Sequence, residues 1–97
     1  MSRVQIEGFL FDDENEDKFT LHQISAFQVN EILEHCYVIL RNRKKQRGLY
    51  LVIGRDNSGH CLSVPVEKTT YKHYWRPITA WVSKESEKVF LIRAEGR

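Results

Sequence analysis

Short apolar runs, and one stretch in which apolar and polar positions alternate, mark the second half of the chain. Four segments, 37–42, 49–54, 60–67 and 74–82, have the length and the β-branched and aromatic composition of strands. In 60–67 the apolar residues occupy every second position, which predicts a strand with one apolar face. The cluster Asp-Asn-Ser-Gly at 56–59 predicts a tight turn. Short connections of this kind favour an antiparallel meander.

The first third of the chain predicts a strand followed by a short helix. An interrupted alternation over 4–11 indicates the strand, within which Gly8 marks a bulge or a close approach of two backbones. The acidic stretch 12–17 then predicts a turn and the start of a helix, where carboxylates are favoured by the helix dipole. We expect this helix to continue through Phe19, His22 and Gln23.

Two further helices are predicted from capping signals. Ser25 precedes Gln28 by three residues, which is the capping-box spacing, and predicts a helix over about 25–35. Ser83 is the candidate N-cap of a helix over 84–94, with inward-facing candidates Val89, Phe90, Leu91 and Ile92. The order strand, two helices, four strands and helix predicts a single α+β domain over 1–97, with the helices packed on one face of the sheet.

Composition agrees with a folded domain outside the membrane. The 97 residues are 41% hydrophobic and 29% charged, and the longest apolar run has five residues, far below the ~20 that a membrane helix needs. The N-terminal residues lack the basic and apolar regions of a secretion signal, and two cysteines make no disulfide framework. We therefore expect a cytoplasmic protein. The sequence does not fix the oligomeric state and is compatible with a monomer or a homo-oligomer.

Charge is distributed very unevenly. Residues 1–34 hold two Lys and Arg against eight Asp and Glu, whereas residues 35–97 hold thirteen against five. Five cations fall between the apolar runs 37–40 and 49–53 of the first two predicted strands: Arg41, Arg43, Lys44, Lys45 and Arg47. Such a cluster favours binding to a polyanion, and RNA is the partner we expect. The alternative is an exposed loop that is charged only for solubility.

Arg76 and Thr79 are the main catalytic candidates. They lie in an apolar segment predicted to be a strand, where a bulge at Pro77 would bring the two side chains together. A fixed guanidinium can stabilise the charge of a phosphate during its transfer. The alternative is a structural ion pair between Arg76 and a carboxylate such as Glu31 or Glu34.

Histidine provides the second candidate chemistry. His22 can exchange protons near neutral pH, which suits RNA cleavage by the 2′-hydroxyl, although a histidine satisfied by a backbone group is the alternative. His73 lies beside Tyr71, Lys72 and Tyr74, a combination that can contact nucleic acid by stacking and charge. A solvated loop would have the same composition.

A metal site is not expected, despite two His-Cys pairs at 35–36 and 60–61. Adjacent strand residues point to opposite faces of a sheet, and zinc ligand pairs are usually spaced two to five residues apart. We therefore predict neither a metal nor a cofactor.

Taken in order, these elements and motifs resemble the BrnT-type toxins of bacterial type II toxin–antitoxin systems, and most of all the uncharacterised bacterial proteins related to them. The similarity covers about Phe9 to Phe90. It is carried by four stretches: His-Gln-Ile-Ser at 22–25 followed by Val29 and Glu31, Tyr-Leu-Val-Ile-Gly at 50–54, Ser-Gly-His-Cys-Leu at 58–62, and Arg-Pro-Ile-Thr-Ala at 76–80. Trp81 stands where the toxins have a second Arg.

The resemblance implies a compact fold akin to RelE-type ribonucleases, RNA cleavage without a metal, and neutralisation by a co-encoded antitoxin. Under this hypothesis Arg76 and Arg55 stabilise phosphate charge, Thr79 lies beside them, His22 carries a proton and the basic segment holds the RNA. The alternative function is a non-catalytic relative that binds RNA or a protein partner, and the missing second Arg favours it.

Overall fold

The computed structural model describes residues 4–42 and 48–96. Its fold is α+β, as predicted, with two helices before the main sheet and one after it. The elements in chain order are β1 (Gly8–Phe9), α1 (Asp13–Leu21), α2 (Ala26–Glu31), the 3₁₀ helix η1 (Ile32–Glu34), β2 (Tyr37–Arg41), β3 (Tyr50–Arg55), β4 (Cys61–Lys68), β5 (Tyr74–Pro77), β6 (Trp81–Val82) and α3 (Glu85–Glu95).

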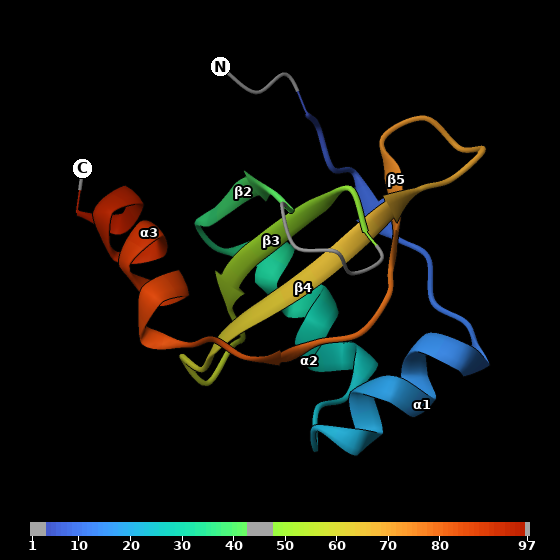
Figure 1. Cartoon of the computed structure of the whole chain (residues 1–97), viewed down its shortest axis with the longest axis horizontal. Coiled ribbons are helices and arrows are strands. Elements are labelled where there is room, and N and C mark those ends of the chain that lie inside the picture. Colours follow the sequence, from blue (N-terminus) through green and yellow to red (C-terminus); the bar gives the residue numbers. More distant parts are fainter. Residues whose placement is uncertain (1–3, 43–47, 97) are drawn as a thin grey trace.

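The strands form one mostly antiparallel sheet in the order β1-β5-β4-β3-β2, with β6 paired to β4 (Figure 1). The strands β2 to β5 form the predicted meander, and β1 joins its edge parallel to β5. In a meander, successive connections leave the sheet at alternating ends. The β2–β3 connection and the β4–β5 loop therefore share one end of the sheet, and the β3–β4 turn lies at the other.

The predicted strand 74–82 is divided into β5 and β6. Val66 pairs with Pro77 and Ser63 with Trp81, so that three residues, 78–80, lie opposite only two residues of β4. This extra residue breaks the ladder as a bulge does, and the Ile78 amide still donates to the Pro65 carbonyl at 2.8 Å. The prediction of a bulge near Pro77 is consistent with this geometry.

Helices cover both faces of the sheet, and the prediction that they share one face is wrong. Val52 packs in the main core with residues of α1, α2 and η1, whereas its neighbour Ile53 packs against Leu91 of α3. Adjacent strand residues face opposite sides. The same arrangement buries β4 on both faces from Cys61 to Val66, where the sequence predicted only one apolar face.

The first helix ends earlier than predicted. Asp12 caps it in a capping box with Asn15, whose buried side chain also donates to the Leu10 and Pro77 carbonyls. His22 is the C-cap, and Gln23 has a positive φ of 59°, so neither continues the helix. The α1 C-terminus therefore exposes the imidazole of His22 instead of packing it along a helical face.

Of the two capping predictions, the one for Ser25 is confirmed and the one for Ser83 is wrong. Ser25 accepts a hydrogen bond from the Gln28 amide at 3.2 Å, and Gln28 returns one to the Ser25 amide at 2.9 Å. Lys84, not Ser83, is the N-cap of α3. Ser83 is buried and its hydroxyl lies 2.8 Å from that of Ser63.

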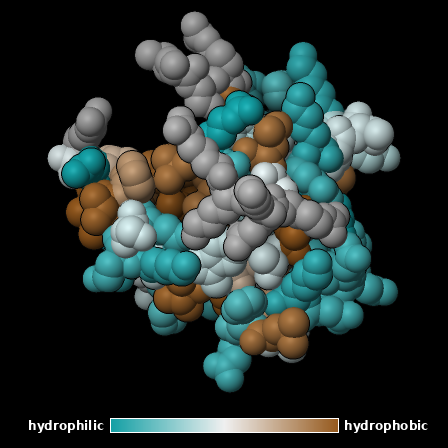
Figure 2. Space-filling model, in the orientation of Figure 1, coloured by the Kyte–Doolittle hydropathy of each residue, from teal (hydrophilic) through white to brown (hydrophobic). Residues whose placement is uncertain are grey.

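Of the four residues predicted to face inward on α3, only Leu91 is buried. The other three, Val89, Phe90 and Ile92, are 41% to 51% exposed. Figure 2 shows hydrophobic side chains gathered around this helix on an otherwise largely hydrophilic face. No helix in the described ranges is both long and apolar enough to span a bilayer.

Candidate functional site

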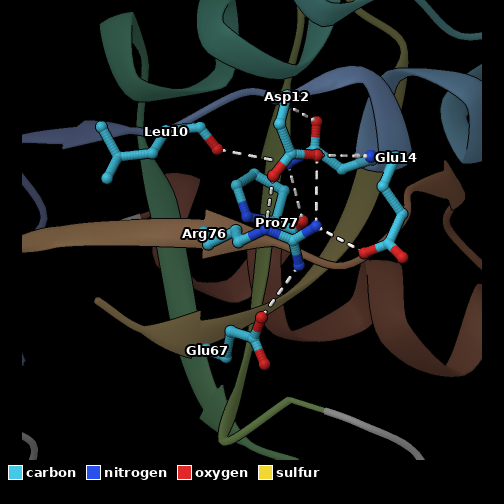
Figure 3. A network of polar contacts seen from close by, with 7 residues as sticks. Leu10, Asp12, Glu14, Glu67, Arg76 and Pro77 are labelled. Carbon is cyan, nitrogen blue, oxygen red and sulfur yellow. Dashed lines mark hydrogen bonds and ion pairs between the residues drawn. The ribbon is translucent and has the colours of Figure 1, made fainter. Parts of the chain in front are cut away.

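The Arg76 guanidinium is surrounded by three carboxylates (Figure 3). Its Nε and Nη2 donate to the two oxygens of Asp12 at 2.7 and 3.1 Å, and Nη2 also donates to Glu14 at 2.7 Å. Nη1 donates to Glu67, the residue opposite Arg76 on β4, at 2.8 Å. Four of the five N–H groups of this arginine are therefore occupied.

Electrostatics make this cluster unfavourable for a phosphate. One guanidinium faces three carboxylates, so the cluster carries a formal charge of −2. The hydrogen bond from Arg76 lowers the pKa of the Asp12 carboxyl below its ordinary value, and the same bond raises the pKa of Arg76. Asp12 therefore stays ionised at neutral pH, and a phosphate would meet its charge and that of Glu14.

The structural alternative for Arg76 was right in kind, but its predicted partners were not. Glu31 instead accepts a hydrogen bond from the Asn57 amide at 3.0 Å, at the other end of the sheet. Thr79 lies in the segment 78–80, which has one residue more than the part of β4 opposite it. Its side chain makes no hydrogen bond with Arg76 within the described ranges. The bulge thus forms without joining these two candidates.

Arg55 likewise forms an ion pair inside the fold, with Glu95. Its Nε and Nη2 donate to the two oxygens of Glu95 at 2.7 and 3.1 Å, and its Nη1 donates to the Gly59 carbonyl at 3.0 Å. The hydrogen bond from Arg55 lowers the pKa of Glu95, and the pKa of Arg55 is raised. This fork links the end of β3 to the end of α3.

The four catalytic candidates do not meet in one site. Arg76 contacts the N-terminal end of α1, and His22 caps its C-terminal end, roughly 13 Å away at 1.5 Å per residue. Arg55 contacts α3. The structure instead places His22 in a shallow groove of about 200 Å³, whose lining includes Gln23, Ile24, Leu62, Val82 and a second histidine, His60.

His60 is oriented by a buried carboxylate. Its Nδ1 lies 3.1 Å from Oδ2 of Asp56, which is only 3% exposed. Burial raises the pKa of Asp56, but hydrogen bonds from Gln28, His60 and Ser58 outweigh it and hold the pKa below its ordinary value. An ionised Asp56 fixes the His60 ring in the manner of a histidine–carboxylate pair, with Nε2 left for another partner.

Trp81 stands at the position where the resemblance to BrnT-type toxins predicts a second Arg. Its side chain makes a hydrogen bond inside the protein. Its indole N–H donates to Oε1 of Glu87 at 3.0 Å, and this oxygen also accepts from Ser63 and from the Lys84 amide. Glu87 is 7% exposed. The indole thus helps to satisfy a buried carboxylate and contributes no charge to a phosphate site.

The end of the sheet that carries the β2–β3 connection holds three described cations, Arg41, Lys68 and Lys72. Arg41 ends β2 and is exposed, in register with Tyr50 and, through it, with Val66. Arg43, Lys44, Lys45 and Arg47 lie outside the described residues. Lys68 and Lys72 border the β4–β5 loop, which extends beyond the sheet at the upper right of Figure 1. Within the described ranges neither lysine, nor Arg41, has an ion pair.

Sequence reasoning missed Asp56 as the partner of His60, and it missed the three carboxylates around Arg76. The i, i+4 spacing of Asp56 and His60 across a predicted turn was an available signal, because an Asp in a turn commonly accepts from amides a few residues on. In the described ranges no three His, Cys, Asp or Glu side chains are arranged to hold a metal ion, and both cysteines are free.

Comparison of this chain with models of protein families, with curated proteins and with solved structures gave no match. The resemblance to BrnT-type toxins therefore remains a hypothesis that rests on the residues quoted for it.

Proposed function

We propose that this protein is an RNA-binding domain that uses one end of its sheet and has no phosphate clamp at Arg76. The observation that carries the proposal is that some of the described cations are ion-paired to carboxylates and others are not. Arg76 and Arg55 are neutralised by carboxylates, whereas Arg41, Lys68 and Lys72 are exposed without a described ion pair. The last three lie at the end of the sheet where β2 ends and the β4–β5 loop begins, which we call the basic end.

Phosphate contacts account for most non-specific affinity between proteins and nucleic acids. Cations that have no intramolecular partner can form such contacts without breaking an ion pair. Among the residues that the structure describes, Arg41, Lys68 and Lys72 meet this condition, whereas Arg76 would first have to leave Asp12, Glu14 and Glu67. RNA binding at the basic end therefore breaks no ion pair that involves Arg41, Lys68 or Lys72 in the described part of the chain, whereas binding at Arg76 would break three.

The test compares two variants that lose equal charge. One replaces Arg43, Lys44, Lys45 and Arg47 with Ser, and the matched control replaces Lys18, Lys84, Lys88 and Arg93 with Ser. We expect only the first to weaken single-stranded RNA binding and to flatten its salt dependence, by about 0.7 in the log–log slope for each lost phosphate contact. Equal affinities and slopes in the two variants would reject the basic end as the binding surface.

The second candidate function is a toxin-like ribonuclease of a type II toxin–antitoxin system that is neutralised by a small antitoxin. The observation that favours it is the groove lined by both His22 and His60, with His60 held by Asp56. Two imidazoles can supply the general base and the general acid that metal-independent RNA cleavage needs.

In such a reaction one imidazole accepts the proton of the 2′-hydroxyl as the 2′-oxygen attacks phosphorus. The bond from phosphorus to the 5′-oxygen breaks, and the other imidazole, in its protonated form, donates a proton to that oxygen. The products are a 2′,3′-cyclic phosphate and a 5′-hydroxyl, so no metal or added reactant enters. Arg76 has no part in this version of the function.

Cleavage of a fluorescent RNA oligomer distinguishes the two candidates. If the groove is catalytic, the parent should cleave the RNA, and His22→Ala and His60→Ala should each lose activity without a loss of binding. His35→Ala is the control, because His35 is exposed and bonded to Asn57 outside the groove. A parent that binds RNA and leaves it intact, and that does not inhibit growth on expression, would reject the ribonuclease.

A further inference from the structure

The β4–β5 loop forms a preformed pocket at the basic end of the sheet. Its volume is about 190 Å³, and it is lined by Lys68, Thr69, Tyr71, Lys72, His73, Tyr74 and Trp75. All of these residues belong to one continuous stretch that joins two central strands. The pocket thus combines aromatic rings with two cations in a single loop.

The backbone of this loop is fixed by several hydrogen bonds. The Thr69 hydroxyl donates to the Tyr74 carbonyl at 2.7 Å and accepts from the Tyr71 amide at 3.1 Å. The Tyr74 amide closes the turn on the Tyr71 carbonyl at 3.1 Å, and His73 has a positive φ of 66°. A loop held in this way loses little conformational entropy when a ligand binds.

The neighbouring β1 edge fixes the loop further. The Glu7 amide donates to the His73 carbonyl at 2.7 Å, and the Trp75 indole donates to the Gln5 carbonyl at 3.0 Å. Gly8 lies opposite Tyr74, and a Cβ placed there would be 2.8 Å from the tyrosine ring. Gly8 therefore leaves room for the Tyr74 ring, so the close neighbour of this glycine is a side chain and not the second backbone that the sequence suggested.

Exposure identifies the ring that is available to a ligand. Tyr71 is 66% exposed and Tyr74 is 39% exposed, whereas Trp75 is buried and packs edge-on against Tyr50. An exposed aromatic ring is a general platform for a nucleobase, because every base has a π-face. Lys68 and Lys72 are exposed beside it and can reach the flanking phosphates.

We propose that this pocket binds a nucleobase of single-stranded RNA, with the base stacked on Tyr71 and Lys68 and Lys72 on its flanking phosphates. The inference rests on the proposed RNA-binding function and specifies its ligand. Bases in an RNA duplex are already stacked on one another and cannot enter such a pocket. The domain is therefore selective for unpaired RNA.

The first part of the test uses three probes of equal length: a single-stranded oligouridylate, an RNA duplex and an abasic ribose–phosphate oligomer. We expect the oligouridylate to bind most tightly. Removal of one stacking contact corresponds to a loss of affinity of at least about fivefold. Equal affinity for the three probes would overturn the proposal and leave the electrostatic function in place.

The second part uses variants of exposed aromatic residues, each checked by thermal melting. Tyr71→Ala should weaken oligouridylate binding at least about fivefold, with the salt slope unchanged because no cation is lost. Tyr71→Phe should keep the affinity. Phe27→Ala is the matched control, because Phe27 is 81% exposed on α2 and lies outside the pocket.

The outcomes separate the two proposals. If the parent binds RNA with a steep salt dependence and Tyr71→Ala binds as tightly as the parent, the stacking pocket is wrong and the RNA-binding function stands. If the parent binds none of the three probes, the RNA-binding function fails, and the pocket fails with it.

Discussion

Arg76 contacts carboxylates from both α1 and β4, so that this one side chain joins two distant parts of the chain. Its partners are Asp12 and Glu14 at the start of α1 and Glu67 on the neighbouring strand. The Arg76 side chain is 19% exposed, whereas the side chains of Asp12 and Glu14 are 45% and 59% exposed. Removal of the planar fork would take the Arg76 donors away from these carboxylates, although water can replace part of what is lost.

We therefore expect Arg76→Lys to lower the free energy of unfolding by up to about 1 kcal/mol, because lysine keeps the charge and loses the bidentate geometry toward carboxylates that are largely exposed. Urea denaturation measures this change. Arg93→Lys on the exposed surface of α3 is the control. RNA affinity should be unaffected by either substitution. A fully stable Arg76→Lys protein with reduced RNA affinity would instead support a phosphate clamp.

The same ion pair predicts how stability depends on pH. The hydrogen bond from Arg76 holds the pKa of Asp12 below its ordinary value of 3.8. A carboxyl whose pKa is lower when folded stabilises the folded state above its ordinary pKa, and this contribution is lost as the pH falls through the lower, folded value. Asp12→Asn keeps the N-cap acceptor and removes the charge together with the second acceptor of the Arg76 fork.

The parent should therefore be more stable than Asp12→Asn at pH 7, and the difference should diminish as the pH is lowered through 3.8 and below. Denaturation curves of both proteins across this range measure it. A difference that stays constant down to the lowest pH would show that Asp12 contributes no charge-dependent stability.

Side-chain partners were the least predictable feature at the residue scale. The sequence indicated that Arg76 needed a carboxylate, yet Glu67 is its partner only through the β4–β5 register, and Asp12 only through the packing of α1. Both depend on tertiary structure. By contrast, the reciprocal bonds of Ser25 and Gln28 were predictable, because both residues belong to one turn.

At the scale of elements, α2 has only six residues and depends on its cap. We expect Ser25→Ala to lower the free energy of unfolding by about 1 kcal/mol, because the Gln28 amide loses its acceptor. Thermal or urea denaturation tests this. Ser86→Ala, in the first turn of α3, is the control. Equal effects of the two substitutions would contradict the role of the cap.

Strand positions were predicted well from alternation, but burial of the second sheet face was not. Val52 and Ile53 are both apolar. Two adjacent apolar residues are compatible with a strand that is covered on one face or on both. The choice depends on where α3 packs, and α3 presents Leu91 to the sheet while three other apolar residues remain exposed. Its short apolar run gave no helical stripe that could fix this orientation.

At the scale of the whole molecule, the meander collects residues that are distant in sequence at the two ends of the sheet. One end of the sheet carries Arg41, Lys68 and the β4–β5 loop. The other end carries His60 and Arg55, and it lies roughly 23 Å away along β4 at about 3.3 Å per residue. The uneven charge was evident from the sequence. That Arg41 and the β4–β5 loop share an end follows only from the strand order.

The location of RNA on this surface is the central claim, and amide chemical-shift mapping by NMR tests it most directly. On titration of isotope-labelled protein with single-stranded oligouridylate at low salt, we predict shifts concentrated at Arg41 and residues 68–74, with residues 22–24 and 60–62 unchanged. Shifts centred on His22 and His60, or no shifts at saturating RNA, would contradict the account.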